Sequence, residues 1–173
     1  MNSFLLLIPF LLIRYGLLAI LNKKSIRRAA YFPPRIKAEK SAYLIYQLTT
    51  AAIFIYLFFL KIETVPIELF YAGLTVCVLG LILFSISIAD FAKPSQIGIN
   101  QNGIYRLSRN PMYIAYFIYF IGCVLLTQSL LLLGFVLIFQ ITAHWIILSE
   151  ERWCIREFGE EYLQYMKRVK RYV

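Results

Sequence analysis

Charge, histidine and paired cysteines are scarce in this sequence, and each shortage excludes a class of protein. Only 16% of the 173 residues are charged, whereas about a quarter is usual in soluble domains, so an ordinary soluble domain is excluded. Cys77, Cys123 and Cys154 lie far apart and form no CxxC pair, which argues against disulfides and against zinc. With one histidine, a single chain cannot supply bis-histidine haem ligation. We therefore expect no metal site.

Long apolar runs take the place of charge. Hydrophobic residues make up 61% of the chain, and the mean hydropathy is +0.70. A helix needs about 20 apolar residues to cross a hydrocarbon core of roughly 30 Å. Five runs approach that length, at residues 4–21, 42–60, 69–89, 112–126 and 130–148. The sequence predicts an all-α polytopic membrane protein of about five transmembrane helices, folded as one membrane domain over residues 1–173.

The first and fourth runs need separate comment. The first is too long for a signal peptide and lacks a basic n-region and a small-residue cleavage site, so we expect a retained helix. The fourth is the shortest, and only Thr127, Gln128 and Ser129 separate it from the fifth. We therefore expect the last two helices to form a tight hairpin.

The net charge of +9 is segregated by loop. The basic residues cluster between the first and second runs, between the third and fourth, and after the fifth, with only Lys61 and Arg14 elsewhere. The positive-inside rule puts those loops in the cytoplasm and the N-terminus outside. This topology and attraction to anionic lipid head groups explain the basic excess, so we expect no nucleic-acid partner.

The first three runs look mainly like scaffold. Arg14 lies past the middle of the first run, where we expect its long side chain to snorkel to the cytoplasmic interface, although a residue on a substrate path is the alternative. Gly73 and Gly80 in the third run allow another helix to approach closely.

A polar segment, GIYRLSRNPMY at residues 103–113, directly precedes the fourth run. Asn102 and Gly103 form a turn signal, and Arg106 and Arg109 supply two positive charges. Asn110 and Pro111 have the pattern of an N-cap followed by proline at the first helical position. A cap explains Asn110 and Pro111 but leaves the arginines and tyrosines around them unexplained.

The fifth run carries its polar residues on one line. At about 100° per residue, Gln140, His144 and Glu151 lie within roughly 40° of one another. Such a stripe must face protein or a water-lined cavity, and interhelical hydrogen bonding is the structural alternative. Because Glu150 and Glu151 stand where the apolar run stops, we take His144 and Glu151 as candidate catalytic residues.

The C-terminal region is charged and amphipathic. Phe158, Tyr162, Tyr165 and Val169 recur at helical spacing. The pattern predicts a cytoplasmic amphipathic helix, which either binds anionic lipid or covers the cytoplasmic mouth of the hairpin.

The C-terminal half of the sequence resembles the membrane methyltransferases grouped around isoprenylcysteine carboxyl methyltransferase and phospholipid methyltransferase. The features that carry the resemblance are GIYRLSRNPMY, a short hairpin, EER and FGEEYLQYMKRVKR, in that order. The resemblance covers about residues 98–171 and implies a cytoplasmic pocket for S-adenosylmethionine there, with residues 1–97 mainly as scaffold. The residues it implies for cofactor binding are Gly103, Tyr105, Arg109, Asn110, Pro111, Tyr113, Glu150 and Glu151.

The sequence departs from the family pattern at two places. Asn110 stands where the family has histidine, and an amide cannot carry a proton. Prenylcysteine methyltransferases have an arginine shortly before the two acids, whereas this chain has none between His144 and Ser149, which argues against a carboxylate acceptor.

The chemistry of these residues agrees with a methyltransferase. Acids suit the ammonium of S-adenosylmethionine, arginines suit its carboxylate, and a tyrosine face suits its sulfonium. A lipophilic acceptor would arrive through the bilayer, and His144 would take a proton from an amine or thiol. Two alternatives remain. One is a lipid-binding membrane protein without catalysis. The other is a sterol-reductase-like enzyme using NADPH, for which no extra basic cluster suits a 2′-phosphate.

Overall fold

The computed structural model describes residues 1–22, 33, 36–93 and 98–172, and the regular structure in these ranges is helical. The first span, Ser3–Leu21, is a continuous rod of four short pieces: the 3-10 turn η1 (Ser3–Leu6), α1 (Leu7–Leu11), the π-helical turn η2 (Leu12–Leu17) and α2 (Leu18–Leu21). The elements that follow are α4 (Lys37–Phe59), α5 (Ile67–Phe91), the 3-10 turn η3 (Gly103–Arg106), α6 (Pro111–Thr127), α7 (Leu130–Phe158) and α8 (Glu160–Arg168).

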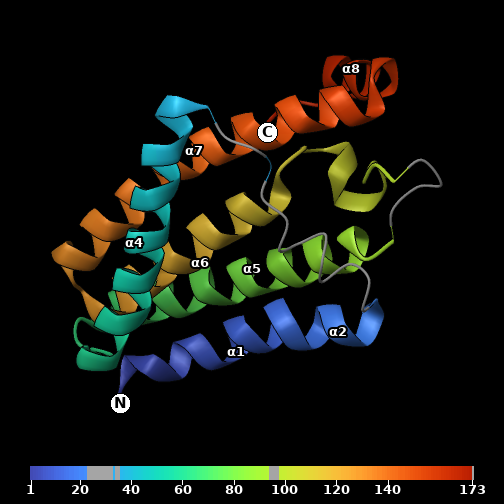
Figure 1. The fold of residues 1–173 in the computed structure, drawn as a ribbon. Coiled ribbons are helices and arrows are strands. Elements are labelled where there is room, and N and C mark those ends of the chain that lie inside the picture. Colours follow the sequence, from blue (N-terminus) through green and yellow to red (C-terminus); the bar gives the residue numbers. More distant parts are fainter. Residues whose placement is uncertain (23–32, 34–35, 94–97, 173) are drawn as a thin grey trace.

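The predicted polytopic all-α architecture is confirmed. In the described part of the chain, four helices are long and apolar enough to cross a membrane, and α6 is a shorter apolar helix of 17 residues. They lie side by side, with the start of α6 and the end of α7 at the same end of the bundle (Figure 1). We call this the α6-start end.

One predicted helix has a different boundary. The apolar run ends at residue 148, but α7 is 29 residues long and reaches Phe158, so Phe158 belongs to α7 and not to the predicted C-terminal amphipathic helix. Its added turns contain glutamate and arginine, which are good helix formers. The helix stops at Gly159, whose φ of +55° favours glycine.

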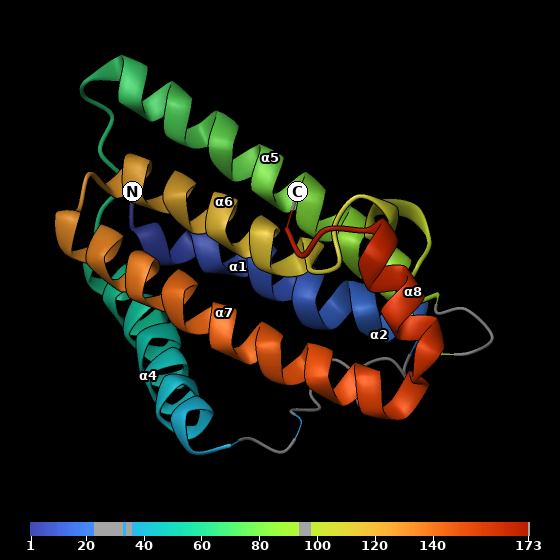
Figure 2. The ribbon, with the colours of Figure 1, turned by 90° about the horizontal axis from the view of Figure 1, so that it is seen from above.

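The connection between α6 and α7 is as short as predicted. Gln128 adopts a left-handed conformation after α6, and the Ser129 side chain caps α7 by accepting a hydrogen bond from the Leu132 amide at 3.2 Å. The two helices nevertheless pack most extensively on other partners. Helix α6 lies along α5 (Figure 2), and α7 packs mainly against α4.

Glycine explains why α6 prefers α5. A Cβ atom added at Gly80 would come within 2.7 Å of the Tyr119 backbone nitrogen, and one at Gly73 within 2.9 Å of the Leu126 backbone nitrogen. The predicted close approach at Gly73 and Gly80 is therefore confirmed, with α6 as the partner. Gly122 completes the contact from the α6 side, against the backbone of Cys77.

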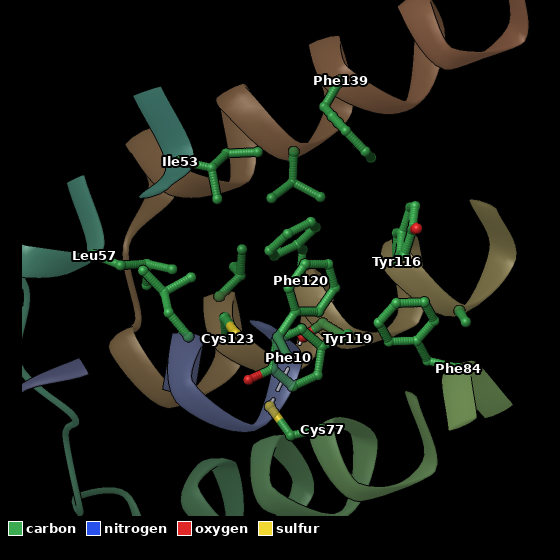
Figure 3. Packing of buried hydrophobic residues seen from close by; sticks show 14 of the residues in the cluster. Phe10, Ile53, Leu57, Cys77, Phe84, Tyr116, Tyr119, Phe120, Cys123 and Phe139 are labelled. Atoms are coloured by element: carbon green, nitrogen blue, oxygen red, sulfur yellow. Dashed lines mark hydrogen bonds between the residues drawn. The ribbon is translucent and has the colours of Figure 1, made fainter. Parts of the chain in front are cut away.

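An aromatic cluster fills the centre of the bundle. Phe10 of the first span has its ring about 5 Å from the rings of Phe84, Tyr116, Tyr119 and Phe120 (Figure 3). Stacked and edge-on pairs at these separations stabilise beyond their buried area. The first span is thereby fixed to both α5 and α6.

The apolar face of the amphipathic helix α8 packs against the rest of the protein. Tyr162, Tyr165 and Val169 are buried in a second small cluster with Ile99. As predicted for one of its two roles, this helix covers the α6-start end of the bundle.

The glycine contacts predict an asymmetric effect of alanine. We expect Gly80→Ala to lower the free energy of unfolding by about 1–3 kcal/mol, because its methyl group would overlap the α6 backbone. Gly134→Ala is the matched control: no heavy atom lies within 4 Å of a Cβ there, so better helix propensity should leave stability equal or higher. Melting temperatures of both variants in one detergent measure this. Equal melting temperatures would contradict the α5–α6 contact.

Candidate functional site

Asp90 fixes the start of the polar segment. Its carboxylate, at the end of α5, accepts a hydrogen bond from the Ile104 amide at 2.8 Å. Gly103 has a φ of +54°, and a Cβ there would fall 1.9 Å from the Asp90 Oδ2 atom. Glycine is therefore required both by backbone conformation and by space. The sequence signal for this contact is an acid closing a span shortly before an Asn-Gly turn.

The turn η3 holds α8 in place. Tyr105 is buried, and its carbonyl accepts a hydrogen bond of 2.6 Å from the Tyr165 hydroxyl. Burial raises the pKa of Tyr165, so the hydroxyl stays protonated and keeps donating. Arg106, at the end of the same turn, is exposed.

Arg109 and Glu151 form a buried ion pair. The Arg109 Nε and Nη2 atoms lie 3.0 and 2.8 Å from the Glu151 Oε1 atom, and the two side chains are 7% and 5% exposed. The Arg109 Nη1 atom also donates to the carbonyls of Met166 and Val169. Four of the five side-chain N–H donors of Arg109 are therefore engaged within the protein.

The C-terminal residues close over this pair. Arg171 donates to both Glu151 oxygens at 2.8 to 3.2 Å, and these bonds raise the pKa of Arg171, so it stays charged. The Lys170 carbonyl accepts from the Arg109 amide, and the Arg171 carbonyl accepts from the Asn110 side chain at 3.1 Å. We call residues 169–172 the C-terminal strap.

Asn110 and Pro111 begin α6 as predicted, with one difference. Pro111 occupies the first helical turn and Asn110 the N-cap position, but the Asn110 side chain makes no capping bond. It donates instead to the C-terminal strap.

Glu150 has a different environment from Glu151. Its Oε1 atom accepts a hydrogen bond from the Tyr113 hydroxyl at 2.9 Å, and no ion pair reaches it from the described residues. At 100° per residue, Glu150 shares a face of α7 with buried Ala143 and Phe139, which look into the bundle. It is a half-buried carboxylate without a direct ion pair among the described residues.

His144 and Gln140 lie on the neighbouring stripe of α7. The His144 Nδ1 atom lies 2.7 Å from the Tyr172 hydroxyl of the C-terminal strap, and burial raises the pKa of Tyr172, which keeps that hydroxyl protonated. If Nδ1 carries the proton and donates, Nε2 is left free as a base. The Gln140 Oε1 atom is buried without a hydrogen-bond partner among the described residues.

Sequence reasoning missed several contacts of this site. Asp90 holds the polar segment, Arg171 shares Glu151, and Arg152 of α7 pairs with Glu39 at the start of α4. The two ion pairs join residues 20 and 113 positions apart in sequence, and no local pattern marks either partner.

Fold and site together define the class of protein. The residues expected to bind a cofactor gather at the α6-start end of a polytopic helical bundle, and His144 lies six residues before Glu150, deeper along α7. The sequence model of the phospholipid methyltransferase family matches residues 70–161, more than half of the chain. No curated protein and no solved structure matches.

The chain belongs to the phospholipid methyltransferase family, whose members transfer methyl groups to lipid-type substrates. The resemblance predicted from the polar segment and the two acids is thereby confirmed. The match begins in α5, which the sequence analysis treats as scaffold and which supplies Asp90.

Proposed function

We propose that this protein is an S-adenosylmethionine-dependent methyltransferase acting on a lipophilic acceptor within the membrane. The observation that carries the proposal is Glu150, a half-buried carboxylate bonded by Tyr113 and without an ion pair among the described residues. Burying a charge without a partner is costly. A cationic ligand at this place removes that cost.

The donor set fits the cofactor. Glu150 would hold its ammonium, and the ring of Tyr113 would face its sulfonium. Arg106 would hold its carboxylate, because Arg109 is already bonded to Glu151 and to two backbone carbonyls. When bound, S-adenosylmethionine supplies a methyl carbon, which bonds to the acceptor's nitrogen, oxygen or sulfur as its bond to the sulfonium sulfur breaks and that sulfur keeps the electron pair.

The chain's own contribution is mainly positioning. Asp90, Gly103 and the Arg109–Glu151 pair fix the polar segment against α7, so Tyr113 and Glu150 are held before any ligand arrives. Alignment of this kind supplies much of the acceleration in a displacement reaction. The NADPH alternative loses support, because Arg109 and Arg171 are both engaged by Glu151 rather than free for a 2′-phosphate.

Neutralising Glu150 should weaken cofactor binding selectively. We expect Glu150→Gln to reduce affinity for S-adenosylmethionine at least tenfold, since loss of a desolvated charge partner costs about 2–5 kcal/mol, while the melting temperature without ligand stays equal or rises. Calorimetry of the detergent-purified protein measures affinity, with NADPH titrated in parallel. Tighter binding of NADPH, or unchanged affinity in the variant, would overturn the assignment.

Glu151→Gln is the matched control for that experiment. It makes the same chemical change one residue along, but it leaves Arg109 buried without its counter-charge. Breaking a buried pair costs about 3–5 kcal/mol, so this variant should melt earlier, whereas its effect on the cofactor is indirect. The two acids are thereby separated.

We further propose that His144 is the base for an amine or thiol acceptor. Its Nδ1–H would donate to the Tyr172 hydroxyl, and Nε2 would take the proton. The stripe that holds His144 also holds the unpartnered Gln140 oxygen, which could accept a hydrogen bond from a ligand.

Two variants test His144. We expect His144→Ala to lower methyl transfer by about 10² to 10⁴ with cofactor affinity retained, because a positioned base contributes that much. Tyr172→Phe keeps the ring and removes the orienting hydroxyl, so its loss should be smaller. If His144→Ala lowers only the melting temperature and keeps its rate per folded molecule, His144 holds the C-terminal strap instead.

The orientation follows from the basic loops. We propose that the α6-start end faces the cytoplasm, close to anionic lipid head groups, with the N-terminus outside. A water-soluble cofactor would reach Glu150 from that side.

Reporter fusions check this orientation. A reporter at the C-terminus should report the cytoplasm, and one after Lys61 should report the opposite compartment. Lys61 lies in the connection between α4 and α5, at the other end of the bundle. The same compartment for both reporters would refute the topology.

A further inference from the structure

A cavity of about 270 Å³ lies between the first span and α4, with α5, α6 and α7 behind it. Its walls are mostly apolar, with the rings of Phe10, Phe120 and Phe139 among them. These three rings belong to different helices and gather in the core (Figure 3). The volume is close to the lower end of ligand pockets, about 300 Å³.

The cavity opens sideways. Two of its lining residues, Tyr15 on the first span and Gln47 on α4, are exposed, at 60% for Tyr15. The first span and α4 are tied together at their other end, where Ser3 bonds the Leu57 carbonyl and Phe4 stacks on Phe58. They diverge from there (Figure 1). A lipid could therefore enter between them from the bilayer.

Among the described residues that line the cavity, Arg14 is the one that carries a charge. Its guanidinium donates to the Tyr116 hydroxyl and lies over the rings of Tyr15 and Tyr116 at 5.9 and 5.4 Å. No carboxylate pairs with it among the described residues. It is bonded within the bundle, which differs from the predicted snorkelling to the interface.

The backbone around Arg14 is also unusual. Residues Leu12–Leu17 form a π-helical turn inside an otherwise tighter helix. Such wide turns are rare and are found frequently at functional sites. A cation within a span is likewise a functional feature by default, and Arg14 has no salt bridge to a carboxylate in the described part of the chain.

The cavity adjoins the cofactor residues. Tyr116 bonds Arg14, and the ring of Tyr113, which bonds Glu150, lies 6.0 Å from the Tyr116 ring. Tyr116 is three residues after Tyr113 in α6, so it lies about 4.5 Å further along the axis of that helix. A series of contacts runs from Glu150 through Tyr113 and Tyr116 to Arg14 and joins the two sites.

We propose that this cavity binds one membrane lipid through an anionic group held on Arg14, with an apolar chain against Phe10, Phe120 and Phe139. The bound lipid is then the methyl acceptor, and this part of the inference rests on the proposed function. The guanidinium recognises a phosphate or carboxylate by charge-assisted hydrogen bonds. The cavity admits the polar end and the first part of one chain, and the remainder stays in the bilayer.

Binding can be tested without cofactor and without turnover. The probe is dodecyl phosphate, added to the purified full-length protein in an uncharged maltoside detergent. A ligand of the folded state raises the melting temperature in a saturable way. We expect dodecyl phosphate to do so, and dodecanol and inorganic phosphate to have little effect at the same concentrations.

Variants locate the site. Arg14→Met should weaken the binding of dodecyl phosphate at least tenfold, whereas Arg14→Lys, which keeps the charge, should recover part of the binding. Thr50→Phe narrows the cavity and leaves Arg14 intact. It should also weaken the binding of dodecyl phosphate, so the site stays testable if Arg14→Met fails to fold. Arg168→Met, on the exposed side of α8, is the control and should bind normally.

Each other outcome overturns the proposal in a defined way. Equal stabilisation by dodecanol would make this an uncharged lipid site, and equal stabilisation by inorganic phosphate would make it a free-anion site. Unchanged binding in both Arg14→Met and Thr50→Phe would place the ligand elsewhere. Calorimetry with S-adenosylmethionine is independent of this assay, so the cofactor assignment and the lipid site can fail separately.

Discussion

The carboxylate of Glu151 is the constraint on which the α6-start end depends. It receives Arg109 from the polar segment and Arg171 from the C-terminal strap, so three parts of the chain meet at one side chain. Each of these charges would be expensive to bury alone. Their mutual pairing therefore fixes the register of the polar segment, the last turns of α7 and the strap at once.

Two adjacent acids can serve different purposes because a helix turns by about 100° per residue. Glu151 faces the strap and is neutralised by arginine, whereas Glu150 faces the bundle and meets only a tyrosine hydroxyl among its described hydrogen-bond partners. Glu151 therefore stabilises the fold. Glu150 is the carboxylate that has no ion pair among the described residues.

Sequence was sufficient for what depends on local pattern. Apolar length located the spans, Gly73 and Gly80 marked a close helix contact, and Pro111 marked the start of α6. It was insufficient where long-range folding decides. Nothing local indicates that Arg171 returns to Glu151, and a change in hydropathy after residue 148 marks where apolar sequence stops, although the α7 backbone continues to Phe158.

The helices of the bundle are packed unevenly, closely between α5 and α6 and less closely beside the first span. Small residues bring these two helices together, while α7 packs mainly on α4, and α4 diverges from the first span (Figure 1). The rings of Phe10, Phe120 and Phe139 fill the centre but leave a cavity beside Arg14. The first span thus does more than anchor the protein. Among the described residues that line the cavity, its Arg14 is the only charged one, and Arg14 bonds Tyr116, whose ring lies 6.0 Å from the ring of Tyr113, the tyrosine that bonds Glu150.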